Sequence, residues 1–210
     1  MNRRRELVRE LGVPVGLIQS TYGGTRIEAW MPLAAFEGDP ALRGLEKVKY
    51  EMSAEGLQAT ELHQSMIAAL VPFGLRGFLW YQGETNCLNA EGGIYANKMR
   101  ALIQSWRNAW NDGSAPFYFA QLAPFNYSHL KNRAKQVSAE SLPAIWEAQQ
   151  AALALGRTGL VATSDLASDV DDIHPTNKRD VGIRFAQLAL ANTYGRTHLA
   201  AEAPRYESFR

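Results

Sequence analysis

The sequence predicts an α/β protein in which a doubly wound parallel β-sheet carries helices on both faces. Short apolar segments recur along the chain and read as buried strands, and segments with apolar residues at helical spacing separate them. Turns rich in glycine and asparagine end the first two of these strands. Strands that alternate with helices pair in parallel, because each crossover helix returns the chain to the same end of the sheet.

The first half of the chain is predicted to contain two strands. Residues 3–11 have the pattern of a short helix, and the apolar run VPVGLIQS at 13–20 is predicted to form a buried strand that ends at TYGGTR. A polar and helical stretch follows from about Pro40 to Leu70. The run LRGFLWYQ at 75–82 is predicted to form the second strand, which GETN ends.

The second half repeats this pattern. An amphipathic helix over 95–111 is indicated by apolar residues at helical spacing, namely Tyr95, Met99, Leu102, Ile103, Trp106 and Trp110. Strands are predicted at 117–122 and 158–163, with a helix at 141–155 between them. A last helix follows from NKRDVG and is expected to stop at Gly195. The polar segment from Pro124 to Ser141 is expected to be a loop.

Composition excludes several kinds of protein. With 210 residues, 46% of them hydrophobic and 20% charged, the chain is expected to fold as one soluble domain. A net charge of +1 is no excess of positive charge of the kind that indicates binding to nucleic acid or to an anionic membrane surface. Cys87 has no second cysteine with which to form a disulfide. No apolar segment follows the N-terminal arginines, so we expect neither a secretion signal nor a membrane span within this chain.

Ligands of open parallel sheets bind beyond the carboxyl ends of the strands, so the loops there are the candidates for chemistry. These loops carry STYGGTR, GETN, APFNYSH and the segment that contains DDIH. An aspartate and a histidine three residues apart, Asp171 and His174, suit a carboxylate that orients an imidazole acting as a general base. Two alternatives stay open. Asp171 or Asp172 would cap the following helix, or Asp165 and its acidic neighbours would bind Ca²⁺, although their order matches no EF-hand loop.

Two further loops offer hydrogen-bond donors. The side-chain amide of Asn86 in GETN is suited to donate to a developing oxyanion, and so are the backbone N–H groups of Gly23 and Gly24 in YGGTR. Both segments are equally consistent with plain tight turns. Trp80 lies in the predicted apolar strand at 75–82, and we expect it to lie in the core rather than to stack on a sugar.

Three long segments together resemble the sialate O-acetylesterase and carbohydrate acetylesterase branch of the SGNH hydrolases. They are VPVGLIQSTYGGTRIEAW, MIAALVPFGLRGFLWYQGETN and DIHPTNKRDVGIRFA, and the resemblance extends over about residues 5–195. It implies a flavodoxin-like α/β fold and serine-type hydrolysis of acetyl esters on sugars, with no metal or other cofactor. It also implies a periplasmic or secreted protein that acts on an acetylated sugar or glycan. The oligomeric state is not predicted.

The resemblance assigns roles to particular residues. His174 becomes the general base and Asp171 its orienting carboxylate, while Asn86 and a backbone N–H of Gly23 or Gly24 form the oxyanion hole, with Gly24 preferred. The implied substrate-binding residues are Arg26, Gln82 and Glu84.

One part of the family pattern has no counterpart in these residues. The nucleophilic serine of the family lies in a GQSN-type block at the end of the first strand, and this sequence contains no such block. We therefore expect the chain to be the C-terminal, larger part of an esterase domain whose first strand is missing here. Ser20 matches a residue beside the nucleophile, and Cys87 is expected to be an inert thiol. The competing hypotheses are a carbohydrate-binding relative without catalysis and a nucleotide-binding protein, although no phosphate-binding glycine motif is present.

Overall fold

The computed structural model describes residues 2–48, 56–71, 73–130, 137–199 and 201. Its centre is a parallel sheet of three strands in the order β1-β2-β3, formed by β1 (Phe78–Trp80), β2 (Phe117–Ala120) and β3 (Thr158–Val161). Phe78 pairs with Phe117, and Phe117 pairs in turn with Thr158, so the strands run side by side in register. The predicted parallel α/β sheet is confirmed, and the strands at 75–82, 117–122 and 158–163 form as shorter ladders within the predicted ranges.

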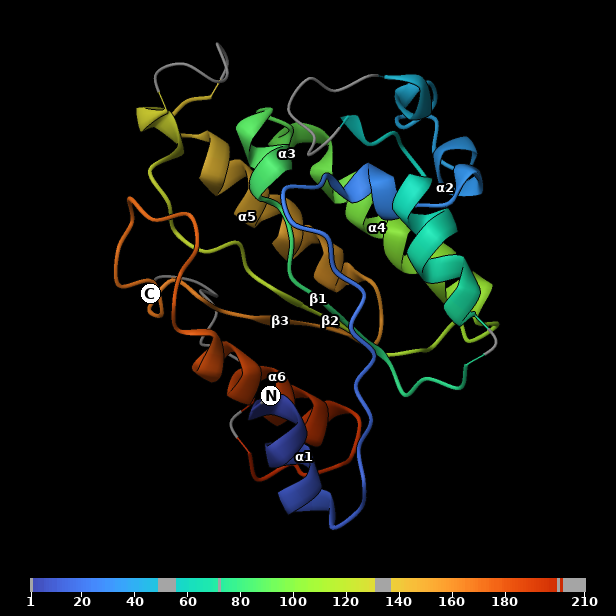
Figure 1. Ribbon diagram of the computed structural model, residues 1–210, viewed down its shortest axis with the longest axis vertical. Helices are drawn as coiled ribbons and strands as arrows, with labels where there is room; N and C mark the ends of the chain where they lie inside the picture. The colour runs from blue at the N-terminus through green and yellow to red at the C-terminus, as the bar shows by residue number, and fades with distance from the viewer. Residues whose placement is uncertain (1, 49–55, 72, 131–136, 200, 202–210) are drawn as a thin grey trace, which may run out of the picture.

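Helices cover both faces of this sheet, as a doubly wound fold requires (Figure 1). On one face, α4 (Gly92–Ala109) packs against α5 (Ser141–Ala151), and the 3-10 helix η7 (Ala152–Ala154) extends α5. On the other face, α6 (Lys178–Asn192) contacts β2 and β3, and α1 (Asn2–Leu11) packs on α6. The helices predicted for these four ranges are therefore present.

The alternation of side chains along β2 fills both layers of the core. Phe117 and Phe119 point into the larger cluster, which also contains Trp106 of α4. Tyr118 and Ala120 point the other way and pack with α6. Every residue of β2 is buried, as expected for a strand of a parallel sheet that is covered on both faces.

The expected strand at 13–20 is wrong. No described residue from 13 to 24 belongs to a strand, and Val13, Leu17 and Ile18 are 52%, 46% and 47% exposed. The segment is extended and runs past β1 (Figure 1). An apolar run becomes a buried strand only when neighbouring segments pair with it and cover it, and no described segment pairs with these residues.

The helical stretch expected from about Pro40 to Leu70 is replaced by short elements. These are the 3-10 helix η2 (Leu45–Lys47), a π-helical turn η4 (His63–Ile67) and the 3-10 helix η5 (Ala68–Leu70). Residues 49–55 of this stretch lie outside the described residues. The predicted loop between strand β2 and helix α5 is confirmed for its described part, apart from the 3-10 turn η6 (Tyr127–His129).

Among the helices that the structure describes, none combines the length and the apolar composition that a membrane crossing needs.

Candidate active site at the carboxyl ends of the strands

Three loops meet beyond the carboxyl ends of β1, β2 and β3. Tyr81 directly follows β1, and the ammonium group of Lys178, at the start of α6, lies 5.0 Å from the centre of its ring. Asn126, in the loop after β2, donates its backbone N–H to the carbonyl oxygen of Val170 in the loop after β3, at 2.8 Å. These contacts bring the segments that contain GETN, APFNYSH and DDIH to one end of the sheet, as the topology predicts.

The loop after β3 carries the predicted acid–base pair on its surface. The His174 side chain is 88% exposed, and its Nδ1 lies 3.7 Å from Oδ1 of Asp172. The same Asp172 oxygen accepts the backbone N–H of His174 at 2.8 Å. Asp171 instead accepts a hydrogen bond from the side-chain amide of Asn126, at 2.6 Å. In this structure, therefore, the carboxylate next to the imidazole belongs to Asp172 and not to the expected Asp171.

The helix-cap alternative for these aspartates is wrong. Asn177 is the N-cap of α6, and its Oδ1 accepts the backbone N–H of Asp180 at 3.2 Å. Asn177 also donates its amide to the Asp180 carboxylate at 2.9 Å, which completes a reciprocal cap. Asp171 and Asp172 lie before this cap, in the loop, where their carboxylates contact Asn126 and His174 instead of capping the helix.

A second connection holds the start of this loop. The guanidinium of Arg184, on α6, binds both carboxylate oxygens of Asp165, at 2.6 and 2.5 Å, and also donates to the Ala162 carbonyl at 2.7 Å. This hydrogen bonding raises the pKa of Arg184 and lowers the pKa of Asp165. The loop that presents His174 is thus held by α6 at one end and by Asn126 in its middle.

No group of three or more His, Cys, Asp and Glu side chains suited to a metal ion occurs in the described ranges.

The glycine turn leads from the extended N-terminal segment into η1 (Ile27–Trp30). Gly24 has a φ of +71°, a conformation that glycine adopts without the strain a side chain would cause. Thr25 stabilises the turn, because its hydroxyl donates to the Tyr22 carbonyl at 2.8 Å and accepts the indole N–H of Trp30 at 3.0 Å. Ser20 donates to the Met66 carbonyl at 3.4 Å, so its hydroxyl is not paired with an imidazole in this structure.

The predicted oxyanion donor Asn86 is fully buried, with 0% of its surface exposed. Its amide nitrogen donates to the carboxylates of Glu28 and Glu91, at 3.0 and 2.7 Å. Both amide hydrogens are therefore used inside the protein, and in this structure Asn86 presents neither to a substrate. This geometry departs from the expectation that Asn86 donates to the oxyanion, because buried carboxylates compete for the same hydrogens.

Two expected substrate-binding residues are also turned inward. Arg26 is 2% exposed and pairs with the carboxylates of Glu28 and Glu91. The amide nitrogen of Gln82 donates to the Thr25 carbonyl at 3.0 Å and to Asn86 Oδ1 at 2.8 Å. The geometry thus departs from the expectation that Arg26 and Gln82 face the substrate, because both side chains are enclosed by the protein.

Glu84 differs from these two, because it is half-buried at the first turn of α3 (Glu84–Leu88). Burial raises the pKa of this carboxyl group. Hydrogen bonds from the backbone N–H groups of Glu84 itself and of Gly83, the latter at 3.0 Å, oppose that rise, as do the electrostatic effects of Lys178 and His174. Tyr127, near Glu84, is buried, and its hydroxyl has no protein partner among the described residues. Glu84 is therefore the carboxyl group after β1 that lies within electrostatic reach of His174.

The inert thiol expected at position 87 fits the structure. Cys87 is fully buried, and burial raises its pKa to about 12, with the nearby Glu84 carboxyl adding to the rise. A thiol with such a pKa stays protonated near neutral pH and is a poor nucleophile.

The expected core position of Trp80 is confirmed, because it is 7% exposed and packs against Trp30 and Trp106.

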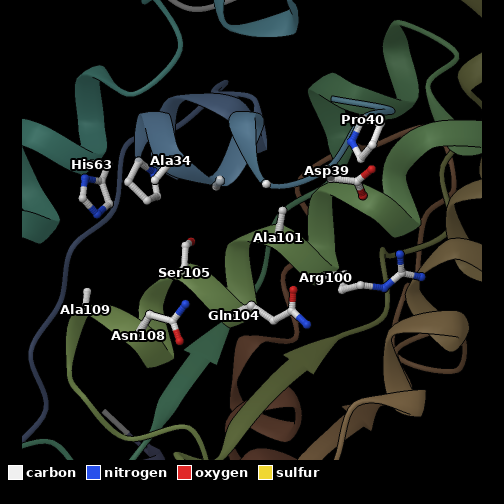
Figure 2. Close-up of a pocket in the computed structure, with 13 residues that line it drawn as sticks. Ala34, Asp39, Pro40, His63, Arg100, Ala101, Gln104, Ser105, Asn108 and Ala109 are labelled. Atoms are coloured by element: carbon white, nitrogen blue, oxygen red, sulfur yellow. The ribbon is translucent and has the colours of Figure 1, made fainter. Parts of the chain in front are cut away.

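A hollow of about 650 Å³ lies away from the strand ends, between α2 (Leu33–Glu37), His63 and the outer face of α4 (Figure 2). Its α4 side carries Arg100, Gln104 and Asn108. None of the residues predicted to act in catalysis or substrate binding lines it. It is therefore separate from the candidate active site.

Two groups of residues at this end of the sheet were not predicted from the sequence. One is Asn126, which holds both Val170 and Asp171. The other consists of Glu28, Glu91 and Lys98, the charged residues that pair with one another beside Asn86. The burial of Lys98 could have been predicted, because this residue falls on the apolar face of the predicted helix, three residues after Tyr95. A charged residue on such a face is buried only when it has a partner of opposite charge.

Comparisons with known proteins agree with the predicted resemblance. A profile of the family described as carbohydrate esterase, sialic acid-specific acetylesterase, matches residues 4–191. Sialate O-acetylesterases from Pongo abelii and Homo sapiens are 31% and 30% identical to the chain over 213 aligned residues. Each alignment covers 95% of this chain and 40% of the relative, so the chain spans less than half the length of these proteins.

Solved structures give the same result. The structure is similar to a carbohydrate acetylesterase from Xanthomonas citri, with a TM-score of 0.79 and 36% identity over 98% of this chain and 43% of that protein. A protein from Arabidopsis thaliana shares the fold, with a TM-score of 0.62 and 21% identity over 90% of this chain and 66% of that one. With the family profile matched over residues 4–191, the chain belongs to the carbohydrate esterase family of sialic acid-specific acetylesterases.

Proposed function

We propose that this chain forms the acid–base part of a carbohydrate O-acetylesterase, which hydrolyses acetyl esters on sugars. The observation that carries the proposal is the family match over residues 4–191, which includes both the glycine turn and the loop of His174. The relatives named sialate O-acetylesterase and carbohydrate acetylesterase support acetylated sugars as the substrate class. Because the chain spans 40% of its curated relatives, activity is proposed for the whole protein to which these residues belong.

In the proposed reaction His174 is the general base. A serine hydroxyl attacks the acetyl carbonyl, and the imidazole takes the hydroxyl proton and then returns it to the leaving sugar oxygen, which leaves an acetyl-serine. A water molecule, deprotonated by the same imidazole, then attacks this ester, and acetate leaves as the proton returns to the serine oxygen. The exposed imidazole of His174 is compatible with this role. We propose that the serine comes from a segment outside these residues, since the family motif that carries it is absent from the sequence.

Asp171 is proposed to orient the imidazole. Asn126 holds one oxygen of the Asp171 carboxylate at 2.6 Å, and the other oxygen has no hydrogen bond among the described residues. That second oxygen is the acceptor for the Nδ1–H of His174 once the imidazole turns from Asp172 toward it. Ion pairing of this kind stabilises the imidazolium that forms during the attack.

The oxyanion donor is proposed to be a backbone N–H of the glycine turn, with Gly24 preferred over Gly23. Neither N–H makes a hydrogen bond within the part of the chain that the structure describes. A backbone donor held at the right place stabilises the negative charge of the tetrahedral intermediate without having to reorganise. Glu84 is retained as a proposed substrate-binding residue, because its half-buried carboxyl group lies near His174.

The test is acetate release by the full-length protein that contains this chain. The protein is incubated with an O-acetylated sialic acid, and acetate and the deacetylated sugar are both quantified. We expect both to appear in equal amounts and at a rate proportional to protein concentration. Saturable binding of the sugar with no acetate above the buffer rate would refute the esterase and support a carbohydrate-binding relative instead. The matched specificity control is the same sugar without its acetyl group.

A further inference from the structure

A compact cluster of charged and amide side chains is buried beside the glycine turn. Its members, here called the Asn86 cluster, are Arg26, Glu28, Asn86, Glu91 and Lys98. The exposed fractions of Arg26, Glu28, Asn86 and Lys98 lie between 0% and 2%, and Glu91 closes the cluster with a side chain that is 14% exposed. Proteins rarely bury this many ionisable groups together, so the arrangement calls for a physical reason.

The charges in the cluster balance. Arg26 binds Glu28 at 2.7 Å and also pairs with Glu91. Lys98 joins the same two carboxylates, at 2.5 Å to Glu28 and 2.9 Å to Glu91. Burial alone raises the pKa of Glu28, but the positive charges of Lys98 and Arg26 outweigh burial and lower this pKa to about 2. The Glu28 carboxyl group therefore stays ionised near neutral pH, and each of the two carboxylates has two cationic partners.

Asn86 lies at the centre of the cluster and uses all of its hydrogen-bonding capacity. Its nitrogen donates to Glu28 and Glu91 at 3.0 and 2.7 Å. Its oxygen accepts the backbone N–H of Ile27 at 3.1 Å and the side-chain amide of Gln82 at 2.8 Å. An amide that makes four internal hydrogen bonds has nothing left to offer a ligand.

These bonds join η1 to two consecutive helices, and the bonded residues are 58 to 70 positions apart in the sequence. Ile27 and Glu28 belong to η1, immediately after the glycine turn, whereas Asn86 lies in α3 and Lys98 in α4. Gln82 adds another bond across the same junction, because it donates to the Thr25 carbonyl at 3.0 Å. The position of the turn relative to the loop after β1 is thus set by the cluster and not by sheet hydrogen bonds, since residues 13–24 pair with no described strand.

We propose that the Asn86 cluster is a positioning device that locks the glycine turn of residues 22–25 onto the loop after β1. In this assignment Asn86 is a positioning residue and does not donate to the substrate, while Glu28, Glu91, Arg26 and Lys98 hold its amide in place. The inference goes beyond the proposed esterase function and does not depend on it, because the locking is a property of the folded chain.

The direct test is hydrogen exchange of the Ile27 amide, measured by NMR in the 210-residue chain. In Asn86→Ala and in Lys98→Met this amide is expected to exchange at least about tenfold faster than in the unmutated chain, because its acceptor is lost or released. Amides in the centre of α6, whose contacts are unchanged, report on global opening and are compared in the same spectra. Asn97→Ala, a substitution on the same helix outside the cluster, is the matched control.

The result is read from the difference between the two sets of amides. Faster exchange at Ile27 with unchanged exchange in α6 supports local locking, and Lys98→Arg is expected to restore most of the protection because it keeps the positive charge. Equal acceleration at both places would show a merely global loss of stability and would overturn the proposal. Unchanged exchange at Ile27 in Lys98→Met would overturn it as well.

A kinetic comparison in the full-length protein separates positioning from direct donation. Lys98 is 1% exposed and cannot touch a substrate. If Asn86 acts by positioning, Lys98→Met and Asn86→Ala lower kcat by similar factors, and Lys98→Arg recovers much of the loss. A drop of about a hundredfold in Asn86→Ala alone, with Lys98→Met at the unmutated rate, would identify Asn86 as an oxyanion donor and contradict the proposal. Failure of the esterase proposal leaves the exchange experiment intact.

Discussion

Two adjacent glycines at the start of α4 provide a sharp test of the packing beneath the candidate site. Gly92 is buried against α5, and a Cβ added there would lie 2.4 Å from the Cβ of Ala144 and 2.9 Å from its carbonyl carbon. Gly93 is exposed, and a Cβ added there would meet no atom within 4 Å. The same substitution at neighbouring positions therefore has opposite predicted effects.

The size of the effect follows from these distances. Carbon atoms pack at about 3.5–4.0 Å, so Gly92→Ala requires α4 and α5 to separate by about 1 Å or more. Overpacking of this kind costs about 1–3 kcal/mol of the free energy of unfolding. Gly93→Ala meets no clash and gains up to about 1 kcal/mol, because alanine loses less backbone entropy than glycine in a helix.

Thermal unfolding followed by circular dichroism measures both variants. A change of 1 kcal/mol shifts Tm by roughly 2–4 °C in a domain of this size. Gly92→Ala is therefore expected to melt several degrees below the unmutated chain, and Gly93→Ala at or slightly above it. Equal Tm values for the two variants, or a lower value for Gly93→Ala, would refute the close packing of α4 on α5.

Three further predictions concern the site and the edge of the sheet. Asn126→Ala in the full-length protein should lower kcat for acetyl-ester hydrolysis with little change in Tm, because Asp171 loses the donor that holds it; an unchanged kcat would speak against this link. The pKa of Glu28 is lowered on folding, so the stability it contributes is present above its unfolded pKa of about 4.5 and is lost as pH falls toward 2. Urea unfolding should therefore show that Glu28→Gln is less stable than the unmutated chain at pH 7 and that this difference shrinks below pH 4.5; a constant difference would contradict the ionised cluster. Among the described strands β1 pairs with β2 alone, so we expect its other edge to mediate self-association of the 210-residue chain. Leu79→Lys on β1 should reduce this self-association in sedimentation experiments, whereas Phe73→Lys, away from that edge, should not; equal effects would mean that the edge is not the contact.

The sheet was predictable because the local sequences of β2 and β3 indicate that these strands are buried. PFYFA and TGLV are continuous apolar runs next to turn residues, and such runs fit strands that are covered on both faces. The run at 13–20 looks similar but is exposed, with Leu17 and Ile18 both near half of their full surface. Local hydropathy cannot tell these cases apart, because burial depends on which segments pair with the run.

The candidate site was predictable at the level of loops but not of side chains. The sequence pattern and the resemblance identified the loops after β1 and β3, and the contacts of Asn126 and Lys178 bring these loops together. The orientation of Asp171 depends on a hydrogen bond from Asn126, which is 45 residues away in the sequence. No local sequence pattern predicts a hydrogen bond between residues so far apart. Asn86 was assigned to the substrate because an amide in a strand-end turn fits an oxyanion donor, but distant carboxylates take both of its hydrogens.

The measurement that tests the central claim most directly is kcat for an aryl acetate in the His174→Ala variant of the full-length protein. Loss of a general base that works together with its nucleophile costs about a thousandfold or more in kcat. His129→Ala is the matched control, because this histidine is also exposed and lies in the neighbouring loop after β2. We predict that His174→Ala abolishes turnover while its Tm and the kcat of the control stay near the unmutated values. A kcat for His174→Ala close to that of the unmutated protein would contradict the assignment of His174 as the base.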